Sequence, residues 1–201
     1  MRQDKKDEGR TKYINALIAE PYNPMTWNGI RNFISSNKLE LKMPDIQRPQ
    51  RFDGTGELLV AEQDTGDSGD DKSKSTPDGT GAWAYYNEVA REWRNKKFHE
   101  RFPDEKEYRH TLEEEKEALE LVAEKVNEDI KKGILKSKEL NPGLITLLEL
   151  QASGLLEPYI LFHLADKGIV KDYPVYRESN RDKLEQYLDR FEVPKGDKLS
   201  L

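Results

Sequence analysis

The chain has 201 residues, of which 35% are hydrophobic and 36% are charged, and its formal net charge is −6. So low an apolar fraction cannot fill a compact core along the whole length, which predicts that part of the chain is unpacked. The acidic balance argues against general nucleic-acid binding, which requires a basic surface. The absence of cysteine excludes disulfides and thiolate chemistry.

Residues 1–60 are predicted to form an N-terminal arm with two short helices and an extended segment. The first helix covers residues 12–20, and the second begins at Asn23-Pro24, a helix cap followed by proline at the first helical position. Apolar residues then recur at helical spacing on one face of this second helix. After it, apolar and charged residues alternate, which predicts a short strand or an extended arm over residues 38–52.

A disordered acidic linker is predicted at residues 61–81, which consist mostly of glycine, serine, threonine and aspartate and show no apolar periodicity. It separates the arm from a helical domain at residues 82–194, and residues 195–201 form a tail. The first helix of this domain begins near residue 82, and the second runs from 104 to 132. A last helix is predicted at residues 174–191.

The longest apolar run, residues 139–170, predicts two short buried helices. Asn141-Pro142 gives a second cap-plus-proline start, and Gly154 and Gly168 are predicted to end the two helices. Glu149 and His163 interrupt the run, so a membrane span is not expected. The predicted fold class is therefore all-α, with a C-terminal bundle of about five helices and an N-terminal helical or extended arm.

The three histidines predict neither a catalytic nor a metal site. Glu107 and His110 have the E-x-x-H spacing of di-metal helical bundles, but the second copy that such a site needs is absent. His163 lies within the apolar run and is expected to be a hydrogen-bonded core histidine. The sequence thus predicts no catalytic residue, no metal ligand and no cofactor.

A candidate basic surface follows the first helix of the predicted domain, where cations and aromatic residues mix as they do in nucleic-acid surfaces. Its cations are Arg91, Arg94, Lys97 and Arg101. Glutamates at 88, 92 and 100 are interleaved with them, so an ion-paired, solvated helix face explains the pattern as well.

We predict a non-enzymatic adaptor or structural subunit of a larger protein assembly that tethers a partner through its N-terminal arm. The alternatives are a nucleic-acid-associated accessory protein and a metal-dependent helical-bundle enzyme that uses His110 with Glu107, or His163 with nearby acids. Other protein chains are the expected partners, and the cytoplasm is the expected location. The predicted partner-binding residues are Trp27, Ile30, Phe33, Ile34, Leu39, Leu41 and Met43.

Two arrangements of the apolar face on the second helix agree equally well with the pattern. Either the face folds back onto the C-terminal domain, or it docks into another protein as a helix in a groove. In the second case its aromatic residues would dominate the binding energy.

Overall fold

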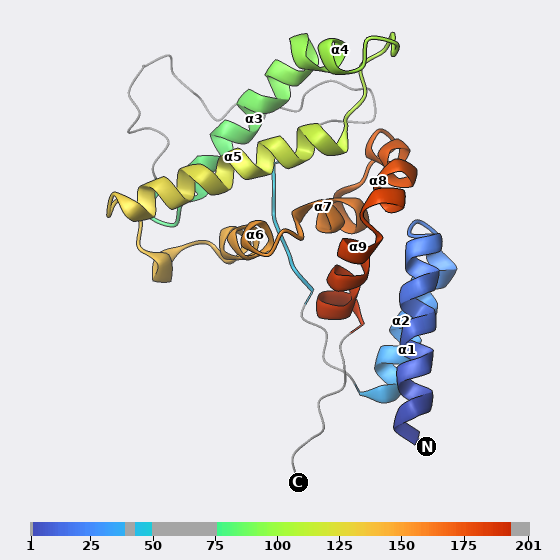
Figure 1. Ribbon diagram of the computed structural model, residues 1–201. Coiled ribbons are helices and arrows are strands. Elements are labelled where there is room, and N and C mark those ends of the chain that lie inside the picture. The colour runs from blue at the N-terminus through green and yellow to red at the C-terminus, as the bar shows by residue number, and fades with distance from the viewer. Residues whose placement is uncertain (1, 39–42, 50–75, 194–201) are drawn as a thin grey trace. The chain divides into compact units, whose positions relative to one another are not determined.

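The computed structural model describes residues 2–38, 43–49 and 76–193, and every regular element in these ranges is a helix (Figure 1). The predicted all-α class is therefore confirmed for the described part of the chain. Leu39, Leu41 and residues 61–75 of the predicted linker lie outside it. In the same ranges, no helix is both long enough and apolar enough to cross a bilayer.

The predicted linker includes residues 76–81, and these form a hydrogen-bonded turn. The Asp78 carboxylate accepts from the hydroxyl groups of Thr76 and Thr80, at 2.9 and 2.7 Å, and from the Thr80 amide at 3.1 Å. Short polar side chains that bond to nearby backbone stabilise turns in this way. The composition that predicted a flexible linker therefore encodes a local turn at the C-terminal end of that segment.

The chain divides into two compact units, each made of segments that are separated in sequence. Unit 1 comprises Met1–Pro44, Arg109–Lys116 and Leu150–Leu201, and unit 2 comprises Asp45–Tyr108 and Glu117–Glu149. This grouping differs from the predicted division into an arm and a C-terminal domain, because the first helix packs against elements near the end of the chain.

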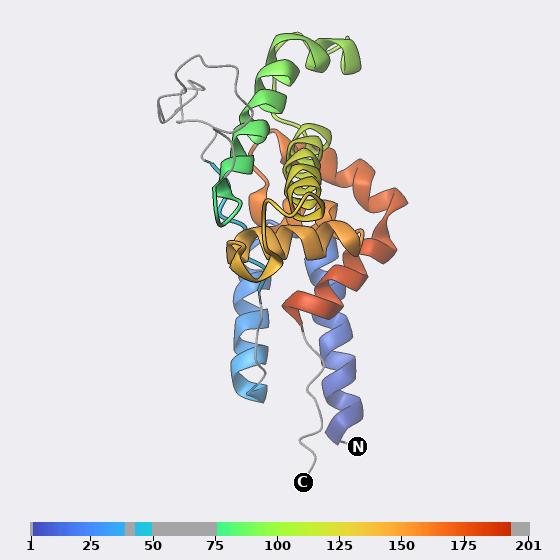
Figure 2. The same cartoon turned by 90° about the vertical axis from the view of Figure 1, so that its left-hand side faces the viewer.

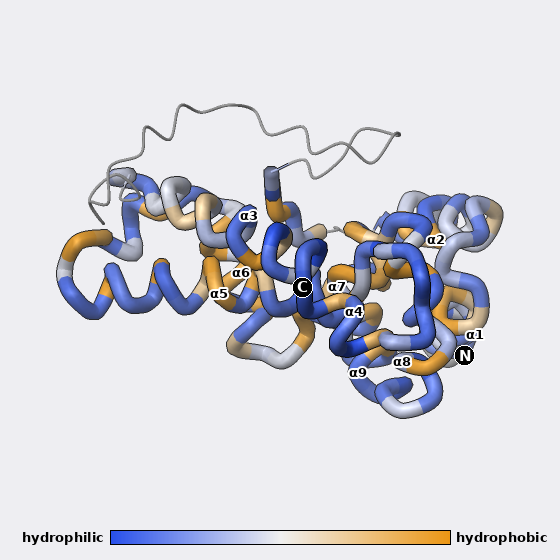
Figure 3. The backbone as a smooth tube through the Cα atoms, turned by 90° about the horizontal axis from the view of Figure 1, so that it is seen from above, coloured by the Kyte–Doolittle hydropathy of each residue, from blue (hydrophilic) through white to orange (hydrophobic). Residues whose placement is uncertain are grey.

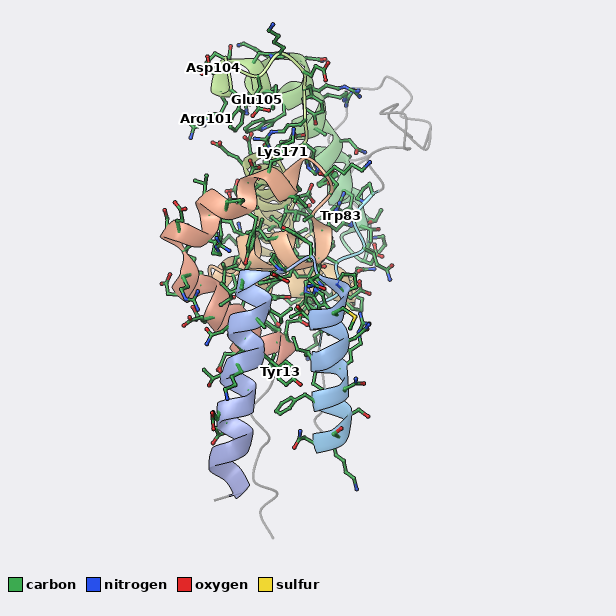
Figure 4. All side chains as sticks on the ribbon, turned by 90° about the vertical axis from the view of Figure 1, so that its right-hand side faces the viewer. Tyr13, Trp83, Arg101, Asp104, Glu105 and Lys171 are labelled. Atoms are coloured by element: carbon green, nitrogen blue, oxygen red, sulfur yellow. The ribbon has the colours of Figure 1, made fainter. Side chains whose placement is uncertain are left out.

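Unit 1 begins with α1 (Arg2–Ala19) and α2 (Pro24–Asn37), which lie side by side (Figures 1 and 2). The predicted cap is confirmed, since the Asn23 side chain accepts a hydrogen bond from the Met25 amide at 2.9 Å. Tyr13, labelled in Figure 4, contacts Phe33 of α2 with 5.2 Å between ring centroids. Helix α1 is longer than the predicted helix at residues 12–20.

The C-terminal part of unit 1 is a series of short helices, π-turns and one 3₁₀-turn. The predicted helix at residues 174–191 is interrupted at Asn180, whose φ of −134° is not helical. The elements are α7 (Leu156–Tyr159), the π-turn η5 (Ile160–Leu164), the 3₁₀-turn η6 (Ile169–Asp172), α8 (Tyr173–Ser179), α9 (Arg181–Tyr187) and the π-turn η7 (Leu188–Glu192).

Polar contacts join α1 to this C-terminal series. The Tyr173 hydroxyl donates to the Ile18 carbonyl at 2.7 Å, and Arg10 donates to the Val193 carbonyl and forms an ion pair with Asp189. Leu17 and Ile18 are fully buried. The first helix therefore supplies part of the core of unit 1.

Unit 2 is built on α3 (Trp83–Glu92), which continues through the π-turn η3 (Trp93–Lys97) into α4 (Phe98–Arg101), and on most of α5 (Leu112–Lys131). Tyr86, Trp93 and Leu119 are among its buried residues. Most of α6 (Pro142–Ala152) also belongs here, and Figure 3 shows how hydrophobic this helix is. The predicted Asn141 cap is confirmed, because its side chain accepts from the Gly143 amide at 2.9 Å.

The long helix α5 begins at Leu112, whereas the sequence analysis placed its start at residue 104. The Thr111 hydroxyl accepts a hydrogen bond from the Glu114 amide at 3.1 Å, which is the side-chain-to-backbone half of a T-x-x-E capping box. Three glutamates in the first turn also favour this start through the helix dipole. The acids at residues 104–107 gave a similar signal but precede the helix.

Candidate functional site

Helix α2 carries most of the predicted partner-binding residues, and the structure places them in different environments. Ile30 is only 2% exposed, so it belongs to the core of unit 1 in this conformation. Trp27, Phe33 and Ile34 are half-buried, and Met43 is exposed. The apolar face therefore folds back on its own unit in part, and partner binding by its half-buried residues stays a prediction.

The half-buried end of this face opens into a hollow of about 330 Å³ in unit 1. Trp27 forms one wall and meets Phe162 of η5 edge to face, with ring centroids 6.2 Å apart. The Trp27 indole N–H donates to the Pro21 carbonyl at 2.6 Å, which fixes the ring. The lining residues are Pro21, Tyr22, Pro24, Trp27, Asn28, Arg31 and Phe162.

The rim of this hollow carries one charged side chain, Arg31. Its guanidinium donates to the Asn28 side-chain carbonyl at 3.1 Å. Among the residues that the structure describes, no carboxylate forms an ion pair with Arg31. Burial, followed by the charges of Tyr173 and Asp172, raises the pKa of Tyr22, so its phenol stays neutral.

Beside Trp27, a buried polar network crosses between two π-turns. His163 of η5 lies 2.7 Å from the Glu192 carboxylate of η7, and the Tyr187 hydroxyl donates to the same oxygen at 3.3 Å. The His163 ring contacts Trp27 with 6.2 Å between centroids. His163 is hydrogen-bonded as predicted, but it is half-buried and not part of the core. Its partner, Glu192, is buried and helps to hold the neighbouring aromatic rings in place. Burial raises the pKa of Tyr187, which keeps this donor protonated.

The other histidine of this unit, His110, is buried and lies between two carboxylates of unit 1. Its Nδ1 is 2.8 Å from Asp166 Oδ2, and its Nε2 is 3.0 Å from Glu115 Oε2. Burial would raise the Asp166 pKa, but bonds from His110 and from the Ile169 and Gly168 amides outweigh it and lower that pKa to about 2. The cluster ties the start of α5 to the loop before η6.

Gly168 has a different role from the predicted helix stop. Its φ is −78°, which any residue adopts, whereas Gly154, the other predicted stop, has φ +69° as a left-handed cap requires. A Cβ atom at Gly168 would lie 2.3 Å from the His110 carbonyl oxygen. Glycine is therefore needed here because the loop approaches the His110 backbone closely.

The candidate basic surface lies on α3, η3 and α4 of unit 2, where carboxylates compensate part of its charge. Lys97 pairs with Glu117 at 2.6 Å and with Glu92 at 3.3 Å, and the Glu117 hydrogen bond raises the Lys97 pKa. Arg94 lies over the Tyr108 ring. Arg91 and Arg101 are exposed, and Figure 4 labels Arg101 beside Asp104 and Glu105. The structure thus favours an ion-paired face here.

The described ranges contain no group of three histidine, aspartate or glutamate side chains arranged to hold a metal ion. No protein-family model, curated protein or solved structure matches this chain.

Sequence reasoning found Trp27 but missed the other residues of the hollow. Arg31 follows Trp27 at the i, i+4 spacing of one face of α2, so that spacing could have grouped the two, whereas Tyr22 precedes the helix. Phe162 gave no such signal, because its proximity to α2 depends on how two distant segments pack.

Proposed function

We propose that this chain is a non-enzymatic adaptor or structural subunit that binds another protein through the α2 side of unit 1. The observation that carries the proposal is the hollow at Trp27, where three aromatic rings and an arginine converge on a partly open surface. Tryptophan, tyrosine and arginine are the residues that most often dominate the binding energy of protein interfaces.

The exposed surface next to the hollow supports the same proposal. Met25 follows the lining residue Pro24 and is 76% exposed. A flexible, polarisable methionine at the edge of an aromatic hollow is typical of surfaces that adapt to a partner chain. Helix α2 would therefore engage its partner while it remains packed within unit 1. The location that we propose is the cytoplasm.

Site-specific photocrosslinking in the source cells tests this function. Benzoylphenylalanine placed at Met25 should give a discrete crosslinked product with a partner protein. The same group at Val175, which is 72% exposed on α8 of the same unit, serves as the matched control and should not give that product. Identical products from both positions, or none from Met25, would contradict the proposed function.

A further inference from the structure

The walls of the hollow define the apolar part of what it can bind. Tyr22, Trp27 and Phe162 present aromatic rings, and Pro21 and Pro24 add two flat pyrrolidine rings. A volume of about 330 Å³ is at the low end of the range for ligand pockets, roughly 300–1,000 Å³. One or two apolar side chains, including the ring of a proline, suit such a space.

The polar groups of the hollow define the rest of the ligand, and most of those still available are donors. The Trp27 N–H is already bound to the Pro21 carbonyl. The Asn28 carbonyl oxygen already accepts from Arg31, and this bond also fixes the amide orientation, since arginine can only donate. What remains is the Asn28 NH₂ group, the other Arg31 N–H groups and the neutral Tyr22 hydroxyl, which can donate or accept. Donors therefore predominate, and they favour a ligand that supplies acceptors.

The charge of the hollow makes that acceptor an anion. Arg31 is the one charged residue among the lining residues, and no carboxylate in the described ranges pairs with it. A planar guanidinium binds a carboxylate through two parallel hydrogen bonds, which gives both affinity and orientation. Arg31 is exposed, and an uncharged acceptor would leave its charge uncompensated, whereas a carboxylate both accepts its hydrogen bonds and neutralises it.

We propose that the hollow binds an acidic segment of the partner protein, in which a proline or other apolar residue stands next to aspartate or glutamate. The apolar side chain enters between Trp27, Tyr22 and Phe162, and the neighbouring carboxylate binds Arg31 and Asn28. This inference rests on the proposed function and names the chemistry of the partner. The exposed Met25 extends the apolar surface along the bound segment.

Binding of the full chain to two matched peptide arrays tests this inference. Every peptide of the first array contains Pro-Leu-Glu at its centre, with varied flanking residues. The second array replaces that glutamate with glutamine and is otherwise identical. We expect binding to members of the first array and at least about tenfold weaker binding to their neutral counterparts, the loss expected for a charge-assisted hydrogen bond.

Two charge-matched variants assign the effect to the hollow. Arg31→Gln should weaken binding of the glutamate peptides about tenfold and leave binding of the glutamine peptides unchanged. Lys171→Gln removes an exposed cation of unit 1 outside the hollow, labelled in Figure 4, and should change neither. The Trp27 indole N–H signal, assigned by Trp27→Phe, should shift in NMR spectra on addition of a bound peptide.

Three results would overturn the inference: equal binding to both arrays, no binding to either, or an equal effect of the two variants. The photocrosslinking at Met25 separates this failure from that of the proposed function. A position-specific crosslink together with any of these three results would mean that α2 binds a partner of different chemistry. Absence of the crosslink at Met25 would contradict the proposed function itself.

Discussion

Unit 1 and unit 2 are both helical, but the contacts that close them join residues at very different sequence separations. In unit 1, Arg10 binds the Val193 carbonyl across 183 residues, and Tyr173 binds Ile18 across 155. In unit 2, Trp93 donates to Glu117 across 24 residues, and Arg48 donates to Tyr86 across 38. Unit 1 is therefore closed by contacts between segments that lie near opposite ends of the chain.

This difference has consequences for both folding and function. Closing a long loop costs more entropy than closing a short one, and local contacts form faster. We expect unit 2 to form first and unit 1 to follow when α1 and α2 dock. Because Trp27 and Phe162 come from segments that meet only then, the proposed binding site depends on the most non-local part of the fold.

Deleting residues 2–38 should have the largest effect, because it removes α1 and α2 together. Leu17, Ile18 and Ile30 are at most 2% exposed, and truncating one such side chain costs about 2–5 kcal/mol. The combined loss is comparable to the whole stability of a typical domain, about 5–15 kcal/mol. We expect residues 156–193 to lose protection from amide hydrogen exchange.

The deletion also tests the comparison between the units. Residues 83–92 and 117–131 should keep their protection, since their closing contacts are local. If residues 156–193 remain protected without α1 and α2, the N-terminal helices are an independent arm and our account of unit 1 fails.

Truncating one core side chain in each unit should test the comparison between the units with a smaller loss of stability. Leu17 and Leu119 are both fully buried, one in each unit. Leu17→Ala and Leu119→Ala should each lower the free energy of unfolding by about 2–5 kcal/mol. Hydrogen exchange should accelerate mainly at residues 173–193 for the first variant and mainly at residues 83–98 for the second. The same pattern from both variants would show that the units do not differ in this way.

Loss of one buried hydrogen bond between the chain ends should have a moderate effect. Tyr173→Phe leaves the Ile18 carbonyl without its 2.7 Å donor, which costs about 1–3 kcal/mol for a buried acceptor. Tyr13→Phe is the matched control, because the Tyr13 hydroxyl makes no hydrogen bond to a described residue. Urea denaturation should separate the two variants, and equal midpoints would refute a role for this bond.

The smallest effect is a pH dependence that arises from Asp166. Its pKa is lowered from 3.8 to about 2 in the folded chain, so its contribution to stability is present above pH 4 and is lost as the pH falls towards 2. The group is partly exposed, and solvent screening keeps the contribution small. The urea midpoints of wild type and Asp166→Asn should differ at pH 7 and converge as the pH falls from 4 towards 2.

Asp182→Asn serves as the charge-matched control for this pH series, because Asp182 is an exposed residue of α9 that pairs with no described cation. Its midpoint should follow that of wild type at every pH. A gap between wild type and Asp166→Asn that stays constant from pH 7 to pH 3 would disprove the assignment to this carboxylate.

Local signals in the sequence predicted local structure well. The caps at Asn23 and Asn141 and the left-handed Gly154 follow from residue types that satisfy the nearby backbone. The start of α5 was also readable from Thr111 and Glu114, but the acids at 104–107 gave a competing signal. The helical type of the elements and the capped boundaries were thus predicted before the fold was known, whereas the starts of α1 and α5 and the break at Asn180 were not.

Contacts between distant segments were not predictable from one sequence. An apolar helix face such as that of α2 has the same pattern whether it packs on its own chain or on another protein. The partners of His163 and His110 are likewise set by tertiary packing, because Glu192 and Asp166 follow no spacing rule. The hollow combines both difficulties, since Phe162 reaches Trp27 only in the folded unit.

The central claim is that α1 belongs to the core of unit 1, and native-state hydrogen exchange in increasing denaturant tests it most directly. Amides of residues 14–19 and 184–188 should open with the same free energy and the same denaturant dependence, because one cooperative unit contains both. If residues 14–19 exchange freely while residues 184–188 stay protected, the N-terminal helix is not part of that unit.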